Sequence, residues 1–505
     1  MSAVMKTPGV YIVEKNAFPN SVVEVATAVP AFIGHTERAD NQGKTLRNVA
    51  WRITSMADYR KYFGGPPKWS FELRDAADAP PLFTQGDSKL ALAQAAAPQG
   101  GNFTLYLSIL MFFQNGGGPC YVVSVGDYTT AVARKALEDG IDPLVKEQEP
   151  TMVLVPEAVL LEPADCYGLQ QTVLKHCGYE MRNRMAILDV PNGWRDTRDP
   201  AGNCIADFRN GIGTNQLDYG AAYYPWLNTT LVQDPELSFE NIANRDRLAT
   251  VIRTELGLGD TPPTDERGKA LQALVDALAG TAASDMTNAQ LHSSLAVVSP
   301  LYKSVMQEAK RQLNVMPPGA AMAGLYTMVD NTRGVWKAPA NVSVIGVISP
   351  TVNLSAAEQE DLNVTPQGKS INAIRSFIGE GTLVWGARTL DGNSLDWRYV
   401  NVRRTMIMLE ESCRLAAKAV VFEPNVSATW VTIRSMLNNF LTNVWKRGGL
   451  AGAVPGDAFS VYVGLGETMT PEDILEGILR VTVLVAISRP AEFIEITFQQ
   501  QMQKS

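Results

Sequence analysis

The chain has 505 residues, which at roughly 150 residues per domain predicts about three domains with substantial cores. Hydrophobic residues make up 46% of the chain and charged residues 19%, an ordinary globular composition that excludes a disordered or collagen-like protein. Lys+Arg 44 against Asp+Glu 52 gives a net charge of -8, the wrong sign for binding through phosphate contacts, so we expect no nucleic acid as a partner.

The N-terminal residues have the pattern of an extended arm. Pro8-Gly9 is a turn signal, residues 10–13 (VYIV) are β-prone, and a second β-prone run follows at residues 22–25. The two runs could pair as a hairpin, or so terminal a segment could lie on the sheet of another subunit. Both alternatives stay open on the pattern alone.

Short apolar runs then alternate with helix-length amphipathic runs up to about residue 231. Strand-like runs cover residues 120–125, 152–155 and 185–190, and a helical pattern covers residues 167–177. This alternation predicts an α/β layer with a partly parallel sheet.

Two stretches interrupt that pattern. Residues 64–102 are rich in Pro, Ala and Gly and are predicted to form a long surface loop. Residues 233–316 are charged and rich in Ala and Leu, which predicts either an inserted helical subdomain or a solvated lid.

The last third has the clearest periodicity. Apolar residues recur at helical spacing over 406–420 and again over 430–444, which predicts two amphipathic helices separated by a break at Pro424. Strand-like segments follow at residues 459–463 and 479–487, and a third lies close to the C-terminus, at residues 493–498.

A search for catalytic patterns finds none that is specific. Gly368-Lys369-Ser370 is the end of a phosphate-binding loop pattern, but Asn363 stands where that loop needs glycine, so we expect an ordinary loop before a helix starting near Ile371. His176 and Cys177 are adjacent on a predicted helix and point about 100° apart, so they cannot face one substrate.

Metal, disulfide and membrane patterns are also weak. The three histidines form no HExxH arrangement and the five cysteines no CxxC pair, so we expect no metal, no cofactor and no disulfide framework. The start of the chain has no apolar leader region and no stretch reaches 18 uninterrupted apolar residues, so we expect no direct membrane insertion.

Several strings together resemble the contractile tail sheath proteins, a family shared by contractile-tailed phages, R-type tailocins and phage-derived extracellular injection systems. Their order along most of the chain makes the resemblance specific. The strings are TPGVYI (7–12), VPAFIG (29–34), YGAAYYPW (219–226), PPG (317–319), AGLY (323–326), RGVWKAPAN (333–341), NAIR (372–375), WGART (385–389), YVNVRR (399–404), FEPN (422–425), GLAG (449–452) and RPAEFI (489–494).

The resemblance implies a mixed α/β fold of several domains with extended terminal β arms. The expected parts are an N-terminal arm (1–30), an outer α/β domain (31–345) with a loop insertion at about 64–102 and a helical insertion at about 233–316, a C-terminal α/β core domain facing an inner tube (346–490), and a C-terminal arm (491–505).

The resemblance also implies a structural function without catalysis. Sheath subunits polymerise around an inner tube as stacked hexameric rings in a metastable extended state, and contraction drives the tube through a target envelope. The expected partners are further copies of the chain, the inner tube protein, baseplate and tail terminator or cap proteins, with sheath paralogues as an additional candidate. Assembly would take place in a bacterial cytoplasm, into a phage tail or a phage tail-like particle that can be released from the cell.

In this family terminal arms add strands to the sheets of neighbouring subunits. The matching positions are Val10, Tyr11, Ile12, Val13, Glu14, Phe493, Ile494, Glu495, Ile496, Thr497 and Phe498. Arg434, Lys446 and Arg447 are candidate contacts with the tube, and the alternative for them is helix solvation and capping. The alternative for the whole chain is a cytoplasmic α/β enzyme whose active site is unrecognised.

Overall fold

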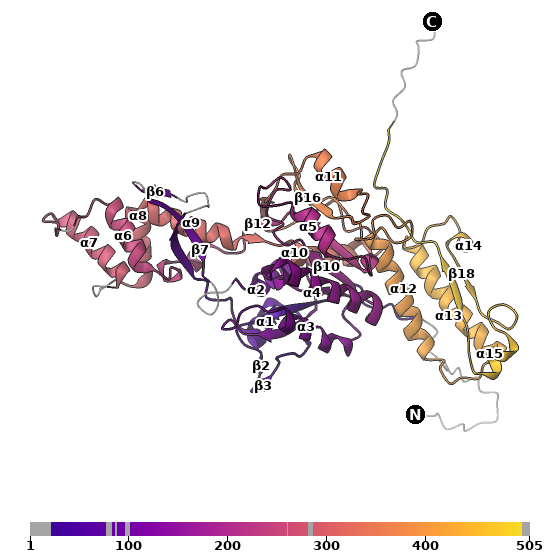
Figure 1. Cartoon of the computed structure of the whole chain (residues 1–505). Helices are drawn as coiled ribbons and strands as arrows, with labels where there is room; N and C mark the ends of the chain where they lie inside the picture. The colour runs from indigo at the N-terminus through magenta and orange to yellow at the C-terminus, as the bar shows by residue number, and fades with distance from the viewer. Residues whose placement is uncertain are drawn as a thin grey trace, which may run out of the picture. The chain divides into compact units, whose positions relative to one another are not determined.

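The computed structural model describes residues 22–76, 83–85, 88–95, 102–259, 261–280 and 286–496 (Figure 1). Within them the chain divides into two compact units. The smaller unit comprises residues 22–25 and 405–488, and the larger comprises residues 26–404 and 489–496. The chain therefore leaves the larger unit after Arg404 and returns to it at Arg489.

A nine-stranded sheet forms the core of the larger unit. In order across the sheet its strands are β14 (Val342–Ser343), β17 (Gly381–Val384), β16 (Asn372–Phe377), β11 (Gly220–Tyr224), β10 (Met185–Asp189), β9 (Met152–Leu154), β1 (Pro30–His35), β8 (Cys120–Gly126) and β4 (Trp51–Ile53). Neighbouring strands run parallel from β16 to β8, and antiparallel strands close both edges. The predicted α/β layer with a partly parallel sheet is confirmed.

Helices pack around this sheet. They are α1 (Met56–Phe63), α2 (Leu105–Gln114), α3 (Arg134–Asp139), α4 (Pro163–Lys175), α5 (Cys204–Gly211), α10 (Gly319–Arg333) and α11 (Ala356–Asn363). A small antiparallel ribbon, β2 (Asp40–Asn41) with β3 (Lys44–Thr45), follows β1.

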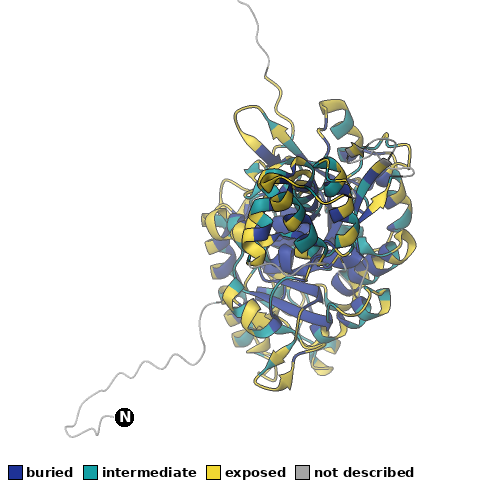
Figure 2. Cartoon of the chain, turned by 90° about the vertical axis from the view of Figure 1, so that its left-hand side faces the viewer, coloured by how far each residue is buried: buried dark blue, intermediate teal, exposed yellow. Residues whose placement is uncertain are grey.

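The helices cover both faces of the sheet. Phe32 of β1 packs against Phe112 of α2 with ring centroids 5.2 Å apart. A side chain at Gly140, directly after α3, would collide with the neighbouring Ile33. Since successive strand residues point to opposite faces, α2 and α3 lie on opposite sides. This explains why every residue of β1 is buried, and Figure 2 shows the strands as the buried interior.

The surface loop predicted for residues 64–102 is wrong. This stretch contains an antiparallel sheet of β5 (Phe71–Asp75), β7 (Ser88–Gln94) and β6 (Phe83–Gln85) in the order β5-β7-β6. Its core residues alternate along the strands, with Leu73 opposite Leu92, and both are buried. The high content of Ala, Pro and Gly made this alternation of buried residues hard to recognise in the sequence.

Residues 233–316 are helical, as predicted. They form α6 (Arg245–Glu255), α7 (Glu266–Ala279), α8 (Asn288–Val298) and α9 (Pro300–Leu313). Side-chain caps start three of these helices: Asp265, Thr287 and Ser299 accept backbone N–H groups of α7, α8 and α9.

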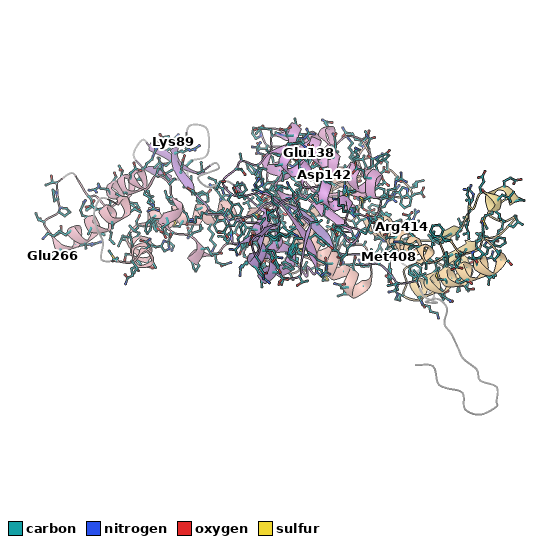
Figure 3. The ribbon with its side chains drawn as sticks, turned by 90° about the horizontal axis from the view of Figure 1, so that it is seen from below. Lys89, Glu138, Asp142, Glu266, Met408 and Arg414 are labelled. Atoms are coloured by element: carbon teal, nitrogen blue, oxygen red, sulfur yellow. The ribbon has the colours of Figure 1, made fainter. Side chains whose placement is uncertain are left out.

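The two interrupting stretches combine into one subdomain. Gln312 of α9 donates to the Leu92 carbonyl of β7 at 2.9 Å, and Leu73 donates its N–H to Asn244, just before α6, at 2.9 Å. Figure 3 shows Lys89 of β7 and Glu266 of α7 in this subdomain, apart from Glu138 of α3. A three-stranded sheet joins it to the body: β13 (Val315–Met316), β12 (Leu227–Thr229) and β15 (Val347–Pro350).

The smaller unit contains most of α12 (Val400–Lys418), all of α13 (Ser427–Lys446) and two short helices, α14 (Pro455–Ala458) and α15 (Pro471–Leu475). The two predicted amphipathic helices are thus present. Its two strands, β18 (Phe459–Tyr462) and β19 (Thr482–Val485), form an antiparallel pair.

The division into units does not coincide with the C-terminal domain expected from residue 346. β16 and β17 lie after that position, yet they belong to the nine-stranded sheet, and residues up to Arg404 stay with the larger unit. The reason is the parallel pairing of β16 with β11, which ties residues 372–373 to the central sheet.

Candidate functional site

The Gly-Lys-Ser loop serves the fold. Lys369 donates through Nζ to the carbonyl of Arg209, and Ser370 donates through Oγ to the carbonyl of Asn363 at 2.7 Å. Burial lowers the pKa of Lys369. The helix predicted to start near Ile371 is wrong, because β16 begins at Asn372 and pairs with β11. Both loop side chains are already bonded within the chain, so this loop offers no phosphate cradle.

His176 and Cys177 begin a short π-helical turn, His176–Met181, and both are buried. Burial, together with the nearby Arg184 guanidinium, lowers the pKa of His176 to about 4. Burial raises the pKa of Cys177 to about 12. At neutral pH the imidazole is uncharged and the thiol is protonated, so the pair is inert as a nucleophile and base.

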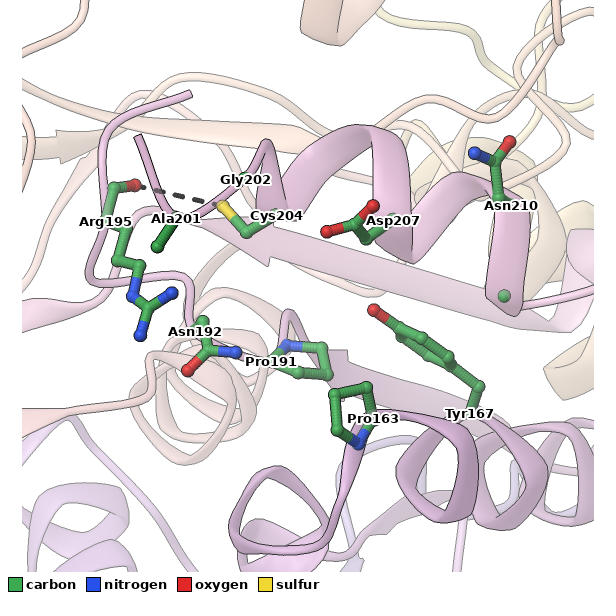
Figure 4. A pocket seen from close by; sticks show the side chains of 11 residues that line it. Pro163, Tyr167, Pro191, Asn192, Arg195, Ala201, Gly202, Cys204, Asp207 and Asn210 are labelled. Carbon is green, nitrogen blue, oxygen red and sulfur yellow. Dashed lines mark hydrogen bonds between the residues drawn. The ribbon is translucent and has the colours of Figure 1, made fainter. Parts of the chain in front are cut away.

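A surface hollow lies beyond the carboxyl end of β10, where α/β folds often bind ligands (Figure 4). Tyr167, Asn192 and Asp207 are among its lining residues, and the Cys204 thiol lies 3.8 Å from the carbonyl oxygen of Arg195. Burial raises the pKa of Cys204 to about 11, so this thiol is no activated nucleophile.

The described residues contain neither a metal-binding cluster nor a membrane-spanning helix. No group of three or more His, Cys, Asp or Glu there could hold a metal ion. No helix in that part of the chain has the length and apolar character needed to cross a membrane.

The start of the larger unit is held by a buried ion pair. Asp330 of α10 accepts two hydrogen bonds from Arg404 of α12, at 2.9 and 2.6 Å, and the two side chains are only 2% and 4% exposed. Arg404 also donates to the Thr27 carbonyl at 2.9 Å, and that carbonyl accepts from Thr151 Oγ1 at 2.7 Å. The guanidinium lies over the Tyr326 ring, 4.7 Å from its centroid. Thr27 is therefore a fixed point from which the N-terminal residues depart.

The last described residues are held in a similar way at Glu492. Its carboxylate accepts from Arg388 Nε at 3.0 and 3.2 Å and from Nη2 at 2.6 Å, from Asn363 Nδ2 at 2.8 Å and from the Tyr399 hydroxyl at 3.1 Å. Burial opposes ionisation of Glu492, but the hydrogen bonds from Arg388 and Asn363 outweigh it and hold its pKa below the usual value. The carboxylate is thus charged and fixed at neutral pH.

Directly after Glu492 the chain is apolar and exposed. Phe493, Ile494 and Ile496 are 75%, 78% and 70% exposed, and Phe493, Ile494, Glu495 and Ile496 form no strand within this single chain. Of the predicted arm residues, Thr497, Phe498 and all of Val10–Glu14 lie outside the described residues. Such a row of exposed large side chains is costly in water unless something covers it.

The β18–β19 pair offers backbone for such a contact. Among the described residues these two strands form a sheet of two, and β18 packs against α13 and α14. Leu484 of β19 is exposed, as is Leu465 shortly after β18. Strands with open edges and apolar side chains can accept a further extended segment.

Two of the three candidate cations on and beside α13 are bonded inside the smaller unit. Arg434 donates to Glu467 at 2.5 Å and to the Val463 carbonyl at 2.6 Å. Arg447 donates to Glu24 at 2.5 Å and so fastens the N-terminal segment to the end of α13. Lys446 is exposed on the last turn of the helix.

Sequence reasoning missed the residues that hold the two chain ends. Arg388, Arg404 and Glu492 stood inside the quoted strings WGART, YVNVRR and RPAEFI, but no role was assigned to them. Arginines within otherwise apolar strings were the available signal, because a buried guanidinium requires a partner.

Comparisons with known proteins show what this chain is similar to. Residues 393–501 match the family model described as "Phage tail sheath C-terminal domain". The tail sheath protein of Vibrio phage KVP40 is 25% identical over 192 residues, which is 37% of this chain and 27% of that protein. The tail sheath protein of Burkholderia phage BcepMu is 27% identical over 184 residues, 35% of this chain and 38% of that protein. The matches thus span well under half the length of these curated relatives.

Solved structures match over nearly the whole chain. The sheath complex of the PVC extracellular contractile injection system in its contracted state has a TM-score of 0.59 and 28% identity, covering 99% of each chain. The helical sheath of the anti-feeding prophage (AFP) in its contracted state has a TM-score of 0.59 and 26% identity, covering 99% of this chain and 100% of that one. A chain of the AFP baseplate structure gives 0.58 and 27%.

Proposed function

We propose, from its membership of the contractile tail sheath family, that this chain polymerises with further copies of itself around an inner tube and contracts to drive that tube through a target envelope. The repeating unit is a hexameric ring, and rings stack into a metastable extended sheath. The proposed partners are the tube protein, baseplate proteins and a tail terminator or cap protein. The particle is a phage tail or an extracellular contractile injection system, built in a bacterial cytoplasm.

The observation that carries this proposal is the near full-length likeness to the PVC contracted sheath, which covers 99% of both chains. A likeness of this extent includes the subdomain of α6–α9 with β5–β7, as well as the two units. Those relatives are structural proteins, which favours a structural role here over the alternative of an α/β enzyme.

The ends of the chain supply the proposed contact between copies. The apolar residues after Glu492 are exposed, and no third strand among the described residues joins the β18–β19 pair. A segment added to this sheet gains backbone hydrogen bonds worth about 1 kcal/mol net each and covers alternate side chains. In an extended segment Ile494 and Ile496 face one way and Phe493 and Glu495 the other. The N-terminal residues Val10–Glu14 are proposed to act likewise.

The proposed tube-facing surface includes Arg434, Lys446 and Arg447. A contact that breaks when the sheath contracts is expected to consist of charged, hydrated side chains and not of tightly packed apolar ones. Since Arg434 and Arg447 already pair with Glu467 and Glu24, Lys446 is the cation of the three most open to the tube.

Contraction in this proposal is driven by burial of surface between subunits. Burying 100 to 200 Å² of additional apolar surface per subunit, at about 25 cal/mol/Å², releases roughly 2 to 5 kcal/mol per subunit, which sums to a large driving force over a sheath. The bonded Gly-Lys-Ser loop is in keeping with a motor that uses no nucleotide.

The test is electron microscopy of the expressed full-length chain. We expect tubes or rings from the wild type and soluble, folded subunits without tubes when residues 493–505 are removed, since this truncation leaves the Glu492 anchor in place. A matched pair of substitutions refines it: Ile496→Lys puts a charge on the apolar face and should reduce tube yield, whereas Glu495→Gln should not. Discrete small oligomers from the wild type, or tubes that survive the truncation, would contradict the proposal.

A further inference from the structure

Among the described residues, the carboxylate of Glu492 is the last strong attachment before the exposed residues 493–496. Five hydrogen bonds from three residues converge on it, and its main partner, Arg388, has a side chain that is only 4% exposed. Arg388 is itself fixed twice more: its Nη1 donates to the Asn363 carbonyl at 3.1 Å, and its backbone N–H donates to Asn372 at 2.7 Å.

These bonds continue into the centre of the larger unit. The Asn372 side-chain amide donates to the carbonyls of Arg388 and Ala222, at 2.8 and 3.2 Å. Asn372 opens β16 and Ala222 lies in β11, two central strands that pair in parallel. Glu492 is therefore connected to the nine-stranded sheet by a short series of buried hydrogen bonds.

The β18–β19 pair precedes this attachment along the chain and is much weaker against a pull. Four residue pairs join the two strands, ending with Val485 opposite Phe459, and neutral backbone contacts continue this pairing over the next residues, from Ala486 to Ala458 and Ala451 and from Ile487 to Leu450. A pull arriving from the C-terminal side would open these pairs one after another. At Glu492 several charge-assisted bonds, each about twice as strong as a neutral hydrogen bond, must break together.

We propose that the Arg388–Glu492 pair transmits mechanical force from the C-terminal segment to the nine-stranded sheet. A second copy of the chain that binds the residues after Glu492 then pulls on that sheet, and the β18–β19 pair carries no force. This inference rests on the proposed function for the identity of the pulling partner. Tyr399 and Asn363 complete the attachment by donating to the same carboxylate. Glu492 positions the residues that follow it, through its bonds to Arg388.

A single-molecule pulling experiment on the full-length chain tests the attachment itself. One handle is placed on the larger unit at the exposed Lys135 (Lys135→Cys) and the other at the C-terminus, and the force of the first rupture is measured. In Glu492→Gln, neutral hydrogen bonds replace charge-assisted ones, so we expect the first rupture force to fall to roughly half. Glu495→Gln removes the same charge three residues later and should match the wild type. Equal first rupture forces in wild type, Glu492→Gln and Glu495→Gln would overturn the proposal.

A second variant and a measurement on assembled tubes complete the test of the attachment. If Glu492→Gln fails to fold, Tyr399→Phe removes one hydrogen bond to the same carboxylate and should give a smaller fall in rupture force; no fall would count against the attachment. Tubes of wild type and Glu492→Gln are then sonicated side by side, and we expect the variant tubes to break sooner. Wild-type chains that form no tubes would defeat the proposed function, whereas the pulling result bears on the attachment alone.

Discussion

Replacing Asp330 by Asn should strongly destabilise the larger unit. The substitution keeps the shape of the side chain, so it opens no cavity, but it leaves the Arg404 guanidinium buried without its counter-charge. Removing one partner of a buried ion pair costs about 3–5 kcal/mol. Arg404 would keep its bond to the Thr27 carbonyl and its contact with the Tyr326 ring. We therefore expect a loss in the lower part of that range, about 3 kcal/mol.

A matched control separates burial from distance. Arg74 and Glu72 form an ion pair with the same 2.6 Å separation as Arg404 and Asp330, but their side chains are 58% and 35% exposed. Exposed pairs contribute about 0–1 kcal/mol, so Glu72→Gln should change the free energy of unfolding by less than about 1 kcal/mol.

The assay is urea unfolding of the full-length wild type, Asp330→Asn and Glu72→Gln, followed by near-ultraviolet circular dichroism. A shift of the midpoint at unchanged slope reports a change in stability. The reasoning would be refuted if Asp330→Asn lost no more stability than Glu72→Gln, because burial would then have no bearing on the strength of this pair.

Three further outcomes are expected. Burial raises the pKa of Asp189 from 3.8 to about 7, so the stability of the wild type relative to Asp189→Asn should be greatest below pH 4 and should be lost as the pH rises to about 7, at up to about 1.4 kcal/mol per pH unit; urea unfolding at several pH values measures this. Because Lys369 already donates to the Arg209 carbonyl, adding Mg-ATP should leave the melting temperature unchanged. Cys177 should react with a thiol reagent at neutral pH only after the chain is unfolded, because it is buried and its pKa is raised to about 12.

Local sequence patterns were sufficient to predict strands of the central sheet and the two long helices. β8 and β10 lie where the apolar runs predicted strands, and α12 and α13 lie where the helical spacing predicted helices. These elements bury continuous runs or one regular stripe, so a window of ten to twenty residues already contains their signal.

The β5–β7 sheet could not be predicted in this way because its partners are remote in sequence. Its strand β7 bonds to Gln312, which lies 220 positions later, and β5 bonds to Asn244, 171 positions later. Neither strand can bury its apolar face on the other alone, so the stretch resembles a loop until α6 and α9 are in place.

The resemblance to sheath proteins predicted arms at the two chain ends. The residues that hold the start of each arm were seen only in the structure. Arg388 meets Glu492 across 104 positions, and Arg404 meets Thr27 across 377. No periodicity links such pairs, yet their physical logic is simple. A segment binds a neighbouring subunit more weakly if the residues before or after it are disordered, because ordering them on binding reduces the net free energy of binding. In this chain those residues are already fixed within the single subunit. The bonds of the Glu492 carboxylate fix the C-terminal segment, and the buried Arg404 guanidinium fixes the N-terminal one. In the proposed assembly, the exposed residues beyond Glu492 would therefore meet a second copy at fixed positions, and the rings of a sheath could share one geometry.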